Sequence, residues 1–400
     1  MARKNTIGLG LFVVTALIAT SATAQKKYGP GVSDTEILLG QTMPYSGPVS
    51  AIGTLGRAME AYFDKVNSEG GINGRKIRLL SRDDAYSPPK TVEQTRRLVE
   101  QDGVLAIVGN VGTATNGAIQ KYLNNNRVPQ LFISSGAAPD PVNAPWTMGW
   151  LPTYASEARI YARYILDNHP TAKIAILFQQ DDYGRDFLKA FLEALGSRAD
   201  AMVVSKIPYQ VTEPTIDSQL VNLRSSGADV LFSISTQKFT SQAIRKIHEL
   251  KWDALVMVPS VSSSIAAVFG PAGLDNAKGV VSALLQKDPV DPAWNDDDGK
   301  RDWVSWMEKF YPKGDRADRG NVAGYTVAQL VVEVLTRCGD DLSRENVMQQ
   351  AKNLRDLQLP MVLAGITADT SPTDYQPFKK LRLHRFDGNS WVPLGAPVGE

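Results

Sequence analysis

The sequence predicts an α/β protein made of two doubly wound α/β lobes joined by a three-segment hinge. Runs rich in Val, Ile and Leu alternate with helix-patterned segments as far as residue 258. The alternation starts afresh after Trp150, which indicates a second lobe. From about residue 300 several helices follow one another and the chain ends in a hairpin pattern. These last segments cannot stand alone, so we expect them to return to the two lobes.

The elements of the first lobe follow from periodicity and end signals. Short apolar runs predict buried parallel strands, and Leu55, Met59 and Phe63 share one face of a helix at the 3.6-residue period. Ser87 followed by Pro88 is typical of a helix start. The expected strands are residues 37–42, 76–81, 104–108 and 130–134, and the expected helices are residues 55–66, 87–101 and 113–125.

The second lobe shows the same alternation. The expected strands are residues 173–178, 202–207, 230–234 and 255–258, and the expected helices are residues 187–195, 216–223 and 239–247. Three helices near residues 303–310, 322–335 and 344–353 then follow in a row. The closing stretch LRLHRFDGNSWVPL predicts a β-hairpin that turns at Asp387-Gly388.

The first 24 residues predict a secretory signal peptide. Arg3 and Lys4 precede an apolar run over residues 7–19, and Ala22-Thr23-Ala24 is a typical cleavage site. The apolar run is shorter than the roughly 20 residues that a membrane-spanning helix needs. We therefore expect an exported protein that does not insert into the membrane once the signal peptide is cleaved.

Charge and cysteine content exclude several classes of partner. Without Arg3 and Lys4, the 43 basic residues fall to 41 against 42 acidic ones, so no net field favours nucleic acid or an anionic membrane. Cys338 is the one cysteine, and a lone thiol forms no internal disulfide. The stability of the protein must therefore come from packed cores.

The stretch VGNVGTATNGAI has the glycine spacing of a phosphate-binding loop between Gly112 and Gly117. It lacks the Lys and the Ser or Thr that hold phosphate and magnesium, because Ala118 and Ile119 stand there. We expect no nucleotide and no cofactor. Free amides at the start of the following helix are still suited to an anion, and a single carboxylate would satisfy them.

Several stretches together resemble a known family. They are GQTMPYSGPVSAIGTLGRAMEAYFDKVNSEGGINGRKIRLLSRDDAYSP, VGNVGTATNGAI, PQLFISSGAA, LFQQDDYGRDF and GITADTSPTD. In this order they are similar to the type I periplasmic binding proteins of branched-chain amino acid ABC importers, which include the leucine/isoleucine/valine-binding protein.

The resemblance implies two lobes that close on a small ligand, with crossings near residues 149, 283 and 359. The first lobe would hold residues 33–149 plus 284–358, and the second residues 150–283 plus 359–396. The resemblance also implies a periplasmic protein. We expect a monomer that delivers its ligand to the ABC permease subunits in the inner membrane.

The family also implies which residues hold the ligand. A hydroxyl and an amide at the glycine-bearing turn would bind the ligand carboxylate. Backbone and hydroxyl groups of the next βα turn would bind the same carboxylate. A tyrosine of the second lobe would cover the ligand. Carried onto this chain, the expected ligand-binding residues are Tyr45, Val111, Thr113, Ala114, Ser134, Ser135, Gly136, Tyr183, Ser235 and Ser260. Two alternatives stay open: Thr113 could cap its helix, and Tyr183 could be a packing residue.

The sequence departs from the family where a ligand ammonium would be paired. Amino-acid-binding members place an acidic residue after the strand that here ends VMVPSVSSS, but this chain has Ser260, Val261 and Ser262 there. The position of a family threonine is Ala138. We therefore expect an aliphatic or aromatic acid, unless Asp181 or Asp182 supplies the charge. Trp146, Trp150 and Tyr154 could form an aromatic wall or pack the hinge.

An exported hydrolase and a sensory receptor are the alternative classes of protein. Two S-x-x-K stretches, at Ser87 and Ser235, lack the K-T-G and S-D-N that accompany them in hydrolases. The three histidines have no metal-binding spacing, and the acidic run before Gly299 fails the calcium-loop pattern, so we expect neither catalytic residues nor a metal site. A receptor domain of the same fold differs only in its partner, which the fold does not reveal.

Overall fold

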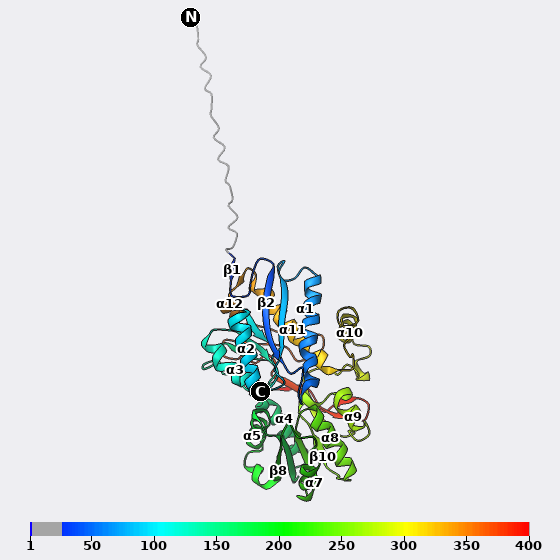
Figure 1. Cartoon of the computed structure of the whole chain (residues 1–400). Coiled ribbons are helices and arrows are strands. Elements are labelled where there is room, and N and C mark those ends of the chain that lie inside the picture. The colour runs from blue at the N-terminus through cyan, green and yellow to red at the C-terminus, as the bar shows by residue number, and fades with distance from the viewer. Residues whose placement is uncertain (2–25, 400) are drawn as a thin grey trace.

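The computed structural model describes residue 1 and residues 26–399, so the expected signal peptide lies outside the described residues. Two α/β lobes lie one above the other in Figure 1. Within the described part of the chain, no helix combines the length and apolar character needed to cross a bilayer. The predicted fold class is thus confirmed.

The first lobe is built on a parallel sheet of five strands in the order β3-β2-β4-β5-β6. Alternate residues of β2 point to opposite faces: Leu39 belongs to the core that includes Met59 of α1, and Leu38 to the core that includes Leu98 and Ile119. The strands are β2 (Glu36–Met43), β3 (Lys76–Asp83), β4 (Ala106–Val108), β5 (Gln130–Ile133) and β6 (Thr147–Gly149). The helices are α1 (Thr54–Ser68), α2 (Pro88–Arg96), α3 (Thr113–Asn125), α10 (Asp298–Phe310), α11 (Arg319–Cys338) and α12 (Arg344–Ala351).

The second lobe is built on an eight-stranded sheet in the order β14-β13-β11-β10-β9-β7-β8, with β15 beside β13. Its strands from β8 to β11 are parallel, whereas β13 runs antiparallel to β11 and β14. The strands are β7 (Ile174–Gln179), β8 (Val203–Tyr209), β9 (Val230–Ile234), β10 (Leu255–Met257), β11 (Val281–Leu284), β13 (Lys380–Phe386), β14 (Trp391–Pro393) and β15 (Val398–Gly399). The helices are α4 (Tyr154–Asn168), α5 (Asp182–Leu195), α6 (Ala199–Met202), α7 (Asp217–Ser225), α8 (Gln237–Glu249) and α9 (Gly270–Ala272). A small parallel pair, β1 (Lys27–Tyr28) and β12 (Asp341–Leu342), lies at the top of the first lobe in Figure 1.

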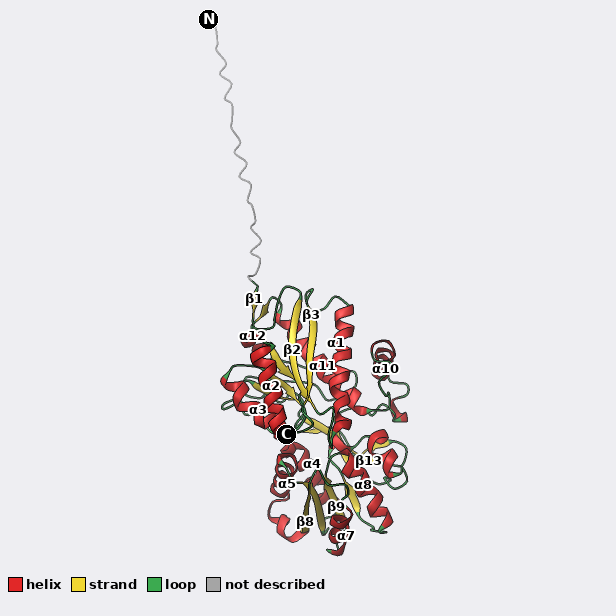
Figure 2. Cartoon of the chain, in the orientation of Figure 1, coloured by secondary structure: helices red, strands yellow, loops and turns green. Residues whose placement is uncertain are grey.

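The predicted C-terminal hairpin is present. Strands β13 and β14 pair antiparallel with Phe386 opposite Trp391, and the turn between them contains Asp387 and Gly388. Because β13 also pairs with β11, the end of the chain joins the second sheet, as Figure 2 shows. The returning helix α11 packs instead against α1 in the first lobe.

Several features differ from the expected elements. The strands β6 and β11 and the helix α4 were not predicted, and the helix from Ser87 changes from α2 to a π-helical turn at Arg97–Gln101. Ser87 stands at the N-cap position, but its side chain makes no capping hydrogen bond. We propose lobe boundaries after residues 149, 283 and 358, in or beside the connections that run between the two sheets.

Candidate functional site

A cavity of about 940 Å³, measured together with its open mouth, lies where strands of both sheets end. Clefts at the carboxyl ends of strands are the usual ligand sites of open α/β sheets. The lining residues are Ile52, Leu55, Tyr86, Val111, Gly112, Thr113, Ser134, Trp150, Leu151, Tyr154, Tyr183, Thr236, Gln237, Ser260, Val261, Ser264, Leu285, Gln286, Arg319, Gly320 and Ala323.

The start of α3 brings backbone donors to this cavity. Gly112 has φ 99°, a conformation that favours glycine, and its amide donates to Ser134 O at 3.1 Å. The next two amides, of Thr113 and Ala114, have no hydrogen-bond partner in the described part of the chain. Thr113 lines the cavity, whereas Ala114 does not. Unpaired amides at a helix start are suited to an anion.

The Thr113 side chain does not cap its helix, because the N-cap residue of α3 is Gly112 and no side chain caps it. The Thr113 hydroxyl lies 2.9 Å from Ser135 Oγ and 2.8 Å from the Tyr154 hydroxyl. It therefore links the first lobe to α4. Removing the hydroxyl would leave two buried polar groups each short of a partner.

The turn after β5 contributes less to the lining than the family resemblance implies. Ser134 lines the cavity, but Ser135 is buried behind it and Gly136 accepts the Tyr154 amide at 2.7 Å. Ser135 and Gly136 thus hold Thr113 and Tyr154 and do not reach the cavity. Ala138 is exposed and lies outside the lining.

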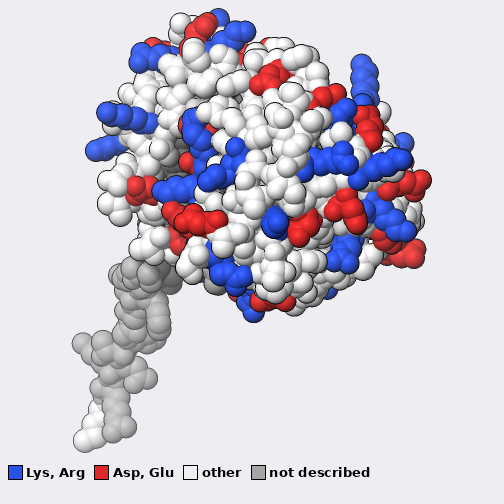
Figure 3. Space-filling view, turned by 90° about the horizontal axis from the view of Figure 1, so that it is seen from below, with Lys and Arg blue, Asp and Glu red and all other residues white. Residues whose placement is uncertain are grey.

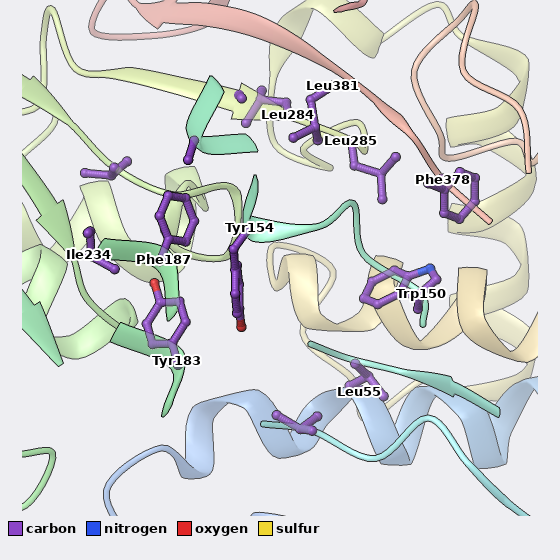
Figure 4. Close-up of a cluster of buried hydrophobic side chains, with 14 of the residues drawn as sticks. Leu55, Trp150, Tyr154, Tyr183, Phe187, Ile234, Leu284, Leu285, Phe378 and Leu381 are labelled. Atoms are coloured by element: carbon purple, nitrogen blue, oxygen red, sulfur yellow. The ribbon is translucent and has the colours of Figure 1, made fainter. Parts of the chain in front are cut away.

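Tyr183 and Tyr154 form the aromatic part of the second-lobe wall. Their ring centroids lie 5.6 Å apart, and Phe187 packs behind both, as Figure 4 shows. The Tyr183 hydroxyl lies 3.4 Å from Ser235 O. Trp150 also lines the cavity, whereas Trp146 does not. Of the three residues of the expected aromatic wall, Trp150 and Tyr154 line the cavity, and Tyr183 lines it beside them.

Two further predicted residues, Tyr45 and Ser235, also lie outside the lining. The Tyr45 hydroxyl lies 2.7 Å from Ser81 Oγ, and Arg57 stacks over the Tyr45 ring, so Tyr45 packs within the first lobe outside the lining. Ser235 is fully buried, and its hydroxyl lies 2.7 Å from Thr240 Oγ1. The chain turns one residue later than expected here, so Thr236 and Gln237 line the cavity in place of Ser235.

Ser260 lines the cavity and is fixed from behind by a buried carboxylate. Glu157 accepts the Ser260 amide at 2.6 Å and the Ser260 hydroxyl at 3.0 Å. Burial raises the pKa of Glu157 to about 7, against the opposing effect of these hydrogen bonds. Glu157 itself is not part of the lining.

Tyr86 and Arg319 are among the lining residues that sequence reasoning missed. Tyr86 has φ 59° and packs on Gly112, where a Cβ would lie 2.6 Å from the tyrosine ring. Arg319 is the first residue of α11, and its Nη1 donates to Ser260 O at 2.9 Å and to Ser263 Oγ. In the sequence, Arg319 directly follows Asp318, a residue suited to start a helix. That pattern predicts a helix start but not a cavity.

The charge of the cavity lining is positive. Among the described residues that line the cavity, Arg319 is charged and none is Asp or Glu. Asp181 caps α5 by accepting the Gly184 amide at 3.2 Å, and Asp182 pairs with Arg185 at 2.8 Å. Neither aspartate therefore supplies a counter-charge for a ligand ammonium in this structure.

Comparison with known proteins agrees with this architecture. A family model described as periplasmic binding protein matches residues 36–389. A Leu/Ile/Val-binding protein homolog 3 of Brucella melitensis is 25% identical over 297 residues, which is 72% of this chain and 77% of that protein.

Solved structures share the fold. A branched chain amino acid ABC transporter protein from Thermus thermophilus with bound valine has a TM-score of 0.82 at 18% identity, covering 92% of this chain and 98% of that one. A fatty acid ABC transporter substrate-binding protein from Thermomonospora curvata has a TM-score of 0.77 at 20% identity, covering 94% and 95%. At these identities the likeness shows the fold alone. The extent of the family match, together with two lobes around a cavity, shows that the chain belongs to the periplasmic binding proteins, a family of non-enzymatic solute binders.

Proposed function

We propose that this protein captures a small carboxylate-bearing ligand that lacks an ammonium group, such as an aliphatic or aromatic acid, and delivers it to inner-membrane permease subunits. The observation that carries the proposal is the composition of the cavity lining. It offers donors, namely the free Thr113 amide and the Ser134 hydroxyl, and contains no Asp or Glu.

A desolvated ammonium needs a counter-charge, because an unpaired buried cation costs several kcal/mol or more. An amino acid bound here would bring an ammonium into a lining whose one charged side chain, Arg319, is itself a cation. An acid without the amine avoids this cost. The fatty acid ABC transporter substrate-binding protein among the structural relatives indicates that the fold is compatible with such acids.

Apolar and aromatic side chains make up most of the remaining wall. They include Leu55, Trp150, Tyr154, Tyr183 and Leu285, which are labelled in Figure 4. These groups favour the hydrocarbon part of an acid, at roughly 25 cal/mol for each Å² of apolar surface removed from water. The expected ligand therefore has one anionic end and an apolar body.

A thermal-shift screen with matched ligands tests this proposal. The protein is first unfolded and refolded to remove any ligand that purified with it. Leucine, 4-methylpentanoate and 3-methylbutylamine share a carbon skeleton but carry both charged groups, the carboxylate alone or the amine alone. A ligand at about 100 times its Kd stabilises by about 2.7 kcal/mol. We expect melting to rise with the acid and not with the amine, and the same order in the phenylalanine, 3-phenylpropanoate and 2-phenylethylamine set. A larger rise with either amino acid than with its acid would contradict the proposed ligand class.

Calorimetry of acid binding to a Thr113→Ala variant tests whether the ligand carboxylate lies at the start of α3. The Thr113 hydroxyl is hydrogen-bonded to Ser135 and Tyr154, so the variant should also lose about 1–2 kcal/mol of ligand-free stability. Thr113→Ser keeps the hydroxyl and serves as the control. Equal affinities of the alanine and serine variants would remove this hydroxyl from the site.

A further inference from the structure

Arg319 is a cation in the cavity without an anionic partner. Its Nη1 donates to Ser260 O and Ser263 Oγ, which are both uncharged acceptors. Within residues 26–399, no carboxylate lies within 4.0 Å of the guanidinium, and its Nε and Nη2 make no hydrogen bond. The two bonds of Nη1 fix the orientation of the side chain, while the other donors remain available.

The nearest carboxylates are engaged in holding the protein backbone. Glu157 accepts the Ser260 amide and hydroxyl, and Asp288 accepts the Ile265 amide at 2.8 Å and the Val290 amide at 3.2 Å. Both lie outside the cavity lining. Burial raises the pKa of Glu157 to about 7 and that of Asp288 to about 6, and neither carboxylate accepts a hydrogen bond from the Arg319 guanidinium.

Arg319 is also separate from the donors at the start of α3. The Thr113 hydroxyl is bonded to Ser135 and Tyr154, whereas the guanidinium is bonded to the turn that contains Ser260 and Ser263. These two groups belong to different elements, α3 and α11, and both line the same cavity. Apolar side chains such as Trp150 and Leu285 make up wall around them.

We propose that Arg319 is a second anion anchor and that the ligand is a two-ended acid, with one carboxylate at the start of α3, an apolar or aromatic spacer, and a second carboxylate at Arg319. This inference rests on the proposed function, which supplies the first carboxylate. It narrows the substrate class from acids in general to dicarboxylates. Planar guanidinium groups bind carboxylates through two parallel hydrogen bonds, and Nε and Nη2 are the pair of donors that remain free.

Calorimetry with matched acids tests the proposal. The pairs hexanoate and adipate, octanoate and suberate, and benzoate and terephthalate differ by one carboxylate on the same skeleton. We expect the best-fitting dicarboxylate to bind about tenfold or more tightly than its partner at pH 8. Arg319→Gln should weaken that dicarboxylate about 10- to 100-fold and its monocarboxylate less than about threefold. Arg319→Lys should restore part of the loss.

Arg316→Gln is the control variant, because Arg316 lies three residues away, is exposed and pairs with Glu308. It should leave both affinities unchanged. Retained monocarboxylate binding by Arg319→Gln shows that the variant has folded. Equal losses for both members of a pair would assign Arg319 to lobe closure and overturn the proposal. Monocarboxylates that bind as tightly as dicarboxylates would overturn this inference alone, whereas a protein that binds neither would overturn the proposed function with it.

Discussion

At the scale of single residues, folding raises the pKa of the Glu157 side chain. It is 4% exposed and lies in α4, one turn after Tyr154. Besides Ser260, the groups that act on it are the Tyr161 hydroxyl at 2.9 Å and the Arg319 charge. Burial outweighs all of these and raises its pKa from 4.5 to about 7. The folded protein therefore holds a proton here that the unfolded chain releases at a lower pH.

This proton gives a pH dependence with a definite sign. Between pH 4.5 and 7 the folded state binds more protons at Glu157 than the unfolded state, so the contribution of Glu157 to the free energy of unfolding falls as pH rises. Glu157→Gln keeps an acceptor for the Ser260 amide but cannot ionise. We expect the variant to gain stability relative to wild type by on the order of 2 kcal/mol between pH 5 and pH 8.

Urea unfolding at several pH values measures this difference. Asp288, whose raised pKa acts in the same direction at lower pH, is present in both proteins and cancels in the comparison. A stability difference between variant and wild type that stays constant from pH 5 to pH 8 would show that Glu157 is ionised throughout.

At the scale of elements, the short connection between β7 and α5 positions Tyr183. Asp181 caps the helix, and Gly184 sits so close to the strand end that a Cβ would lie 1.9 Å from Gln179 O. The first turn of α5 therefore folds directly over the end of β7. This close approach carries the Tyr183 side chain into the cavity wall.

Two glycine-to-alanine substitutions distinguish the effect of close packing between α5 and β7 from the effect of helix propensity. Gly184→Ala should destabilise the protein by about 3 kcal/mol and weaken acid binding, because the first turn of α5 must move. Gly117→Ala is the matched control: Gly117 lies inside α3, is exposed, and has no atom within 4 Å of an added Cβ. The control should gain about 0.5–1 kcal/mol.

Urea unfolding and calorimetry measure both effects. A Gly184→Ala protein with wild-type stability and affinity would show that this connection tolerates a side chain. A loss of stability in Gly117→Ala would mean that an added side chain at this position is not free of contacts.

At the scale of the whole molecule, basic and acidic residues are nearly balanced, with 43 Lys and Arg against 42 Asp and Glu. Figure 3 shows Lys and Arg intermixed with Asp and Glu on the face seen from below. Polar contacts between the lobes include Arg319 Nη1 of α11 with Ser260 O at 2.9 Å and the Thr113 hydroxyl of α3 with the Tyr154 hydroxyl at 2.8 Å. A ligand that touches both lobes would stabilise the closed arrangement and shift the population toward it.

Small-angle scattering tests this shift. We expect the radius of gyration to fall when a saturating acid is added to ligand-free protein, while 3-methylbutylamine, which lacks a carboxylate, leaves it unchanged. An acid that binds in calorimetry without changing the radius of gyration would contradict closure by the ligand.

Much of the fold could be predicted because its signals are local. Val/Ile/Leu runs marked β2, β7 and β9, and Asp387-Gly388 marked the hairpin of β13 and β14. The short strand β11 was missed because a run of four buried residues is too short to show a period. Helix α4 was missed although Tyr154, Ala158, Tyr161 and Ile165 share one buried face at helical spacing.

The site could be predicted only in part. Thr113, Ser134, Tyr183 and Ser260 were expected and line the cavity, because each follows the end of a strand. The prediction of Ser235 was wrong by one residue. Ser235 is buried, and the next residue along the turn, Thr236, lines the cavity.

The sequence by itself determined the class of fold, the family and the strand ends that bear polar groups, because these depend on residues close together in the chain. Only the tertiary structure decided which of those groups share one cavity. Arg319 meets Ser260 across 59 residues of sequence because α11 returns to the first lobe while Ser260 belongs to the second. No local pattern encodes that meeting, since it depends on how the chain crosses between the lobes.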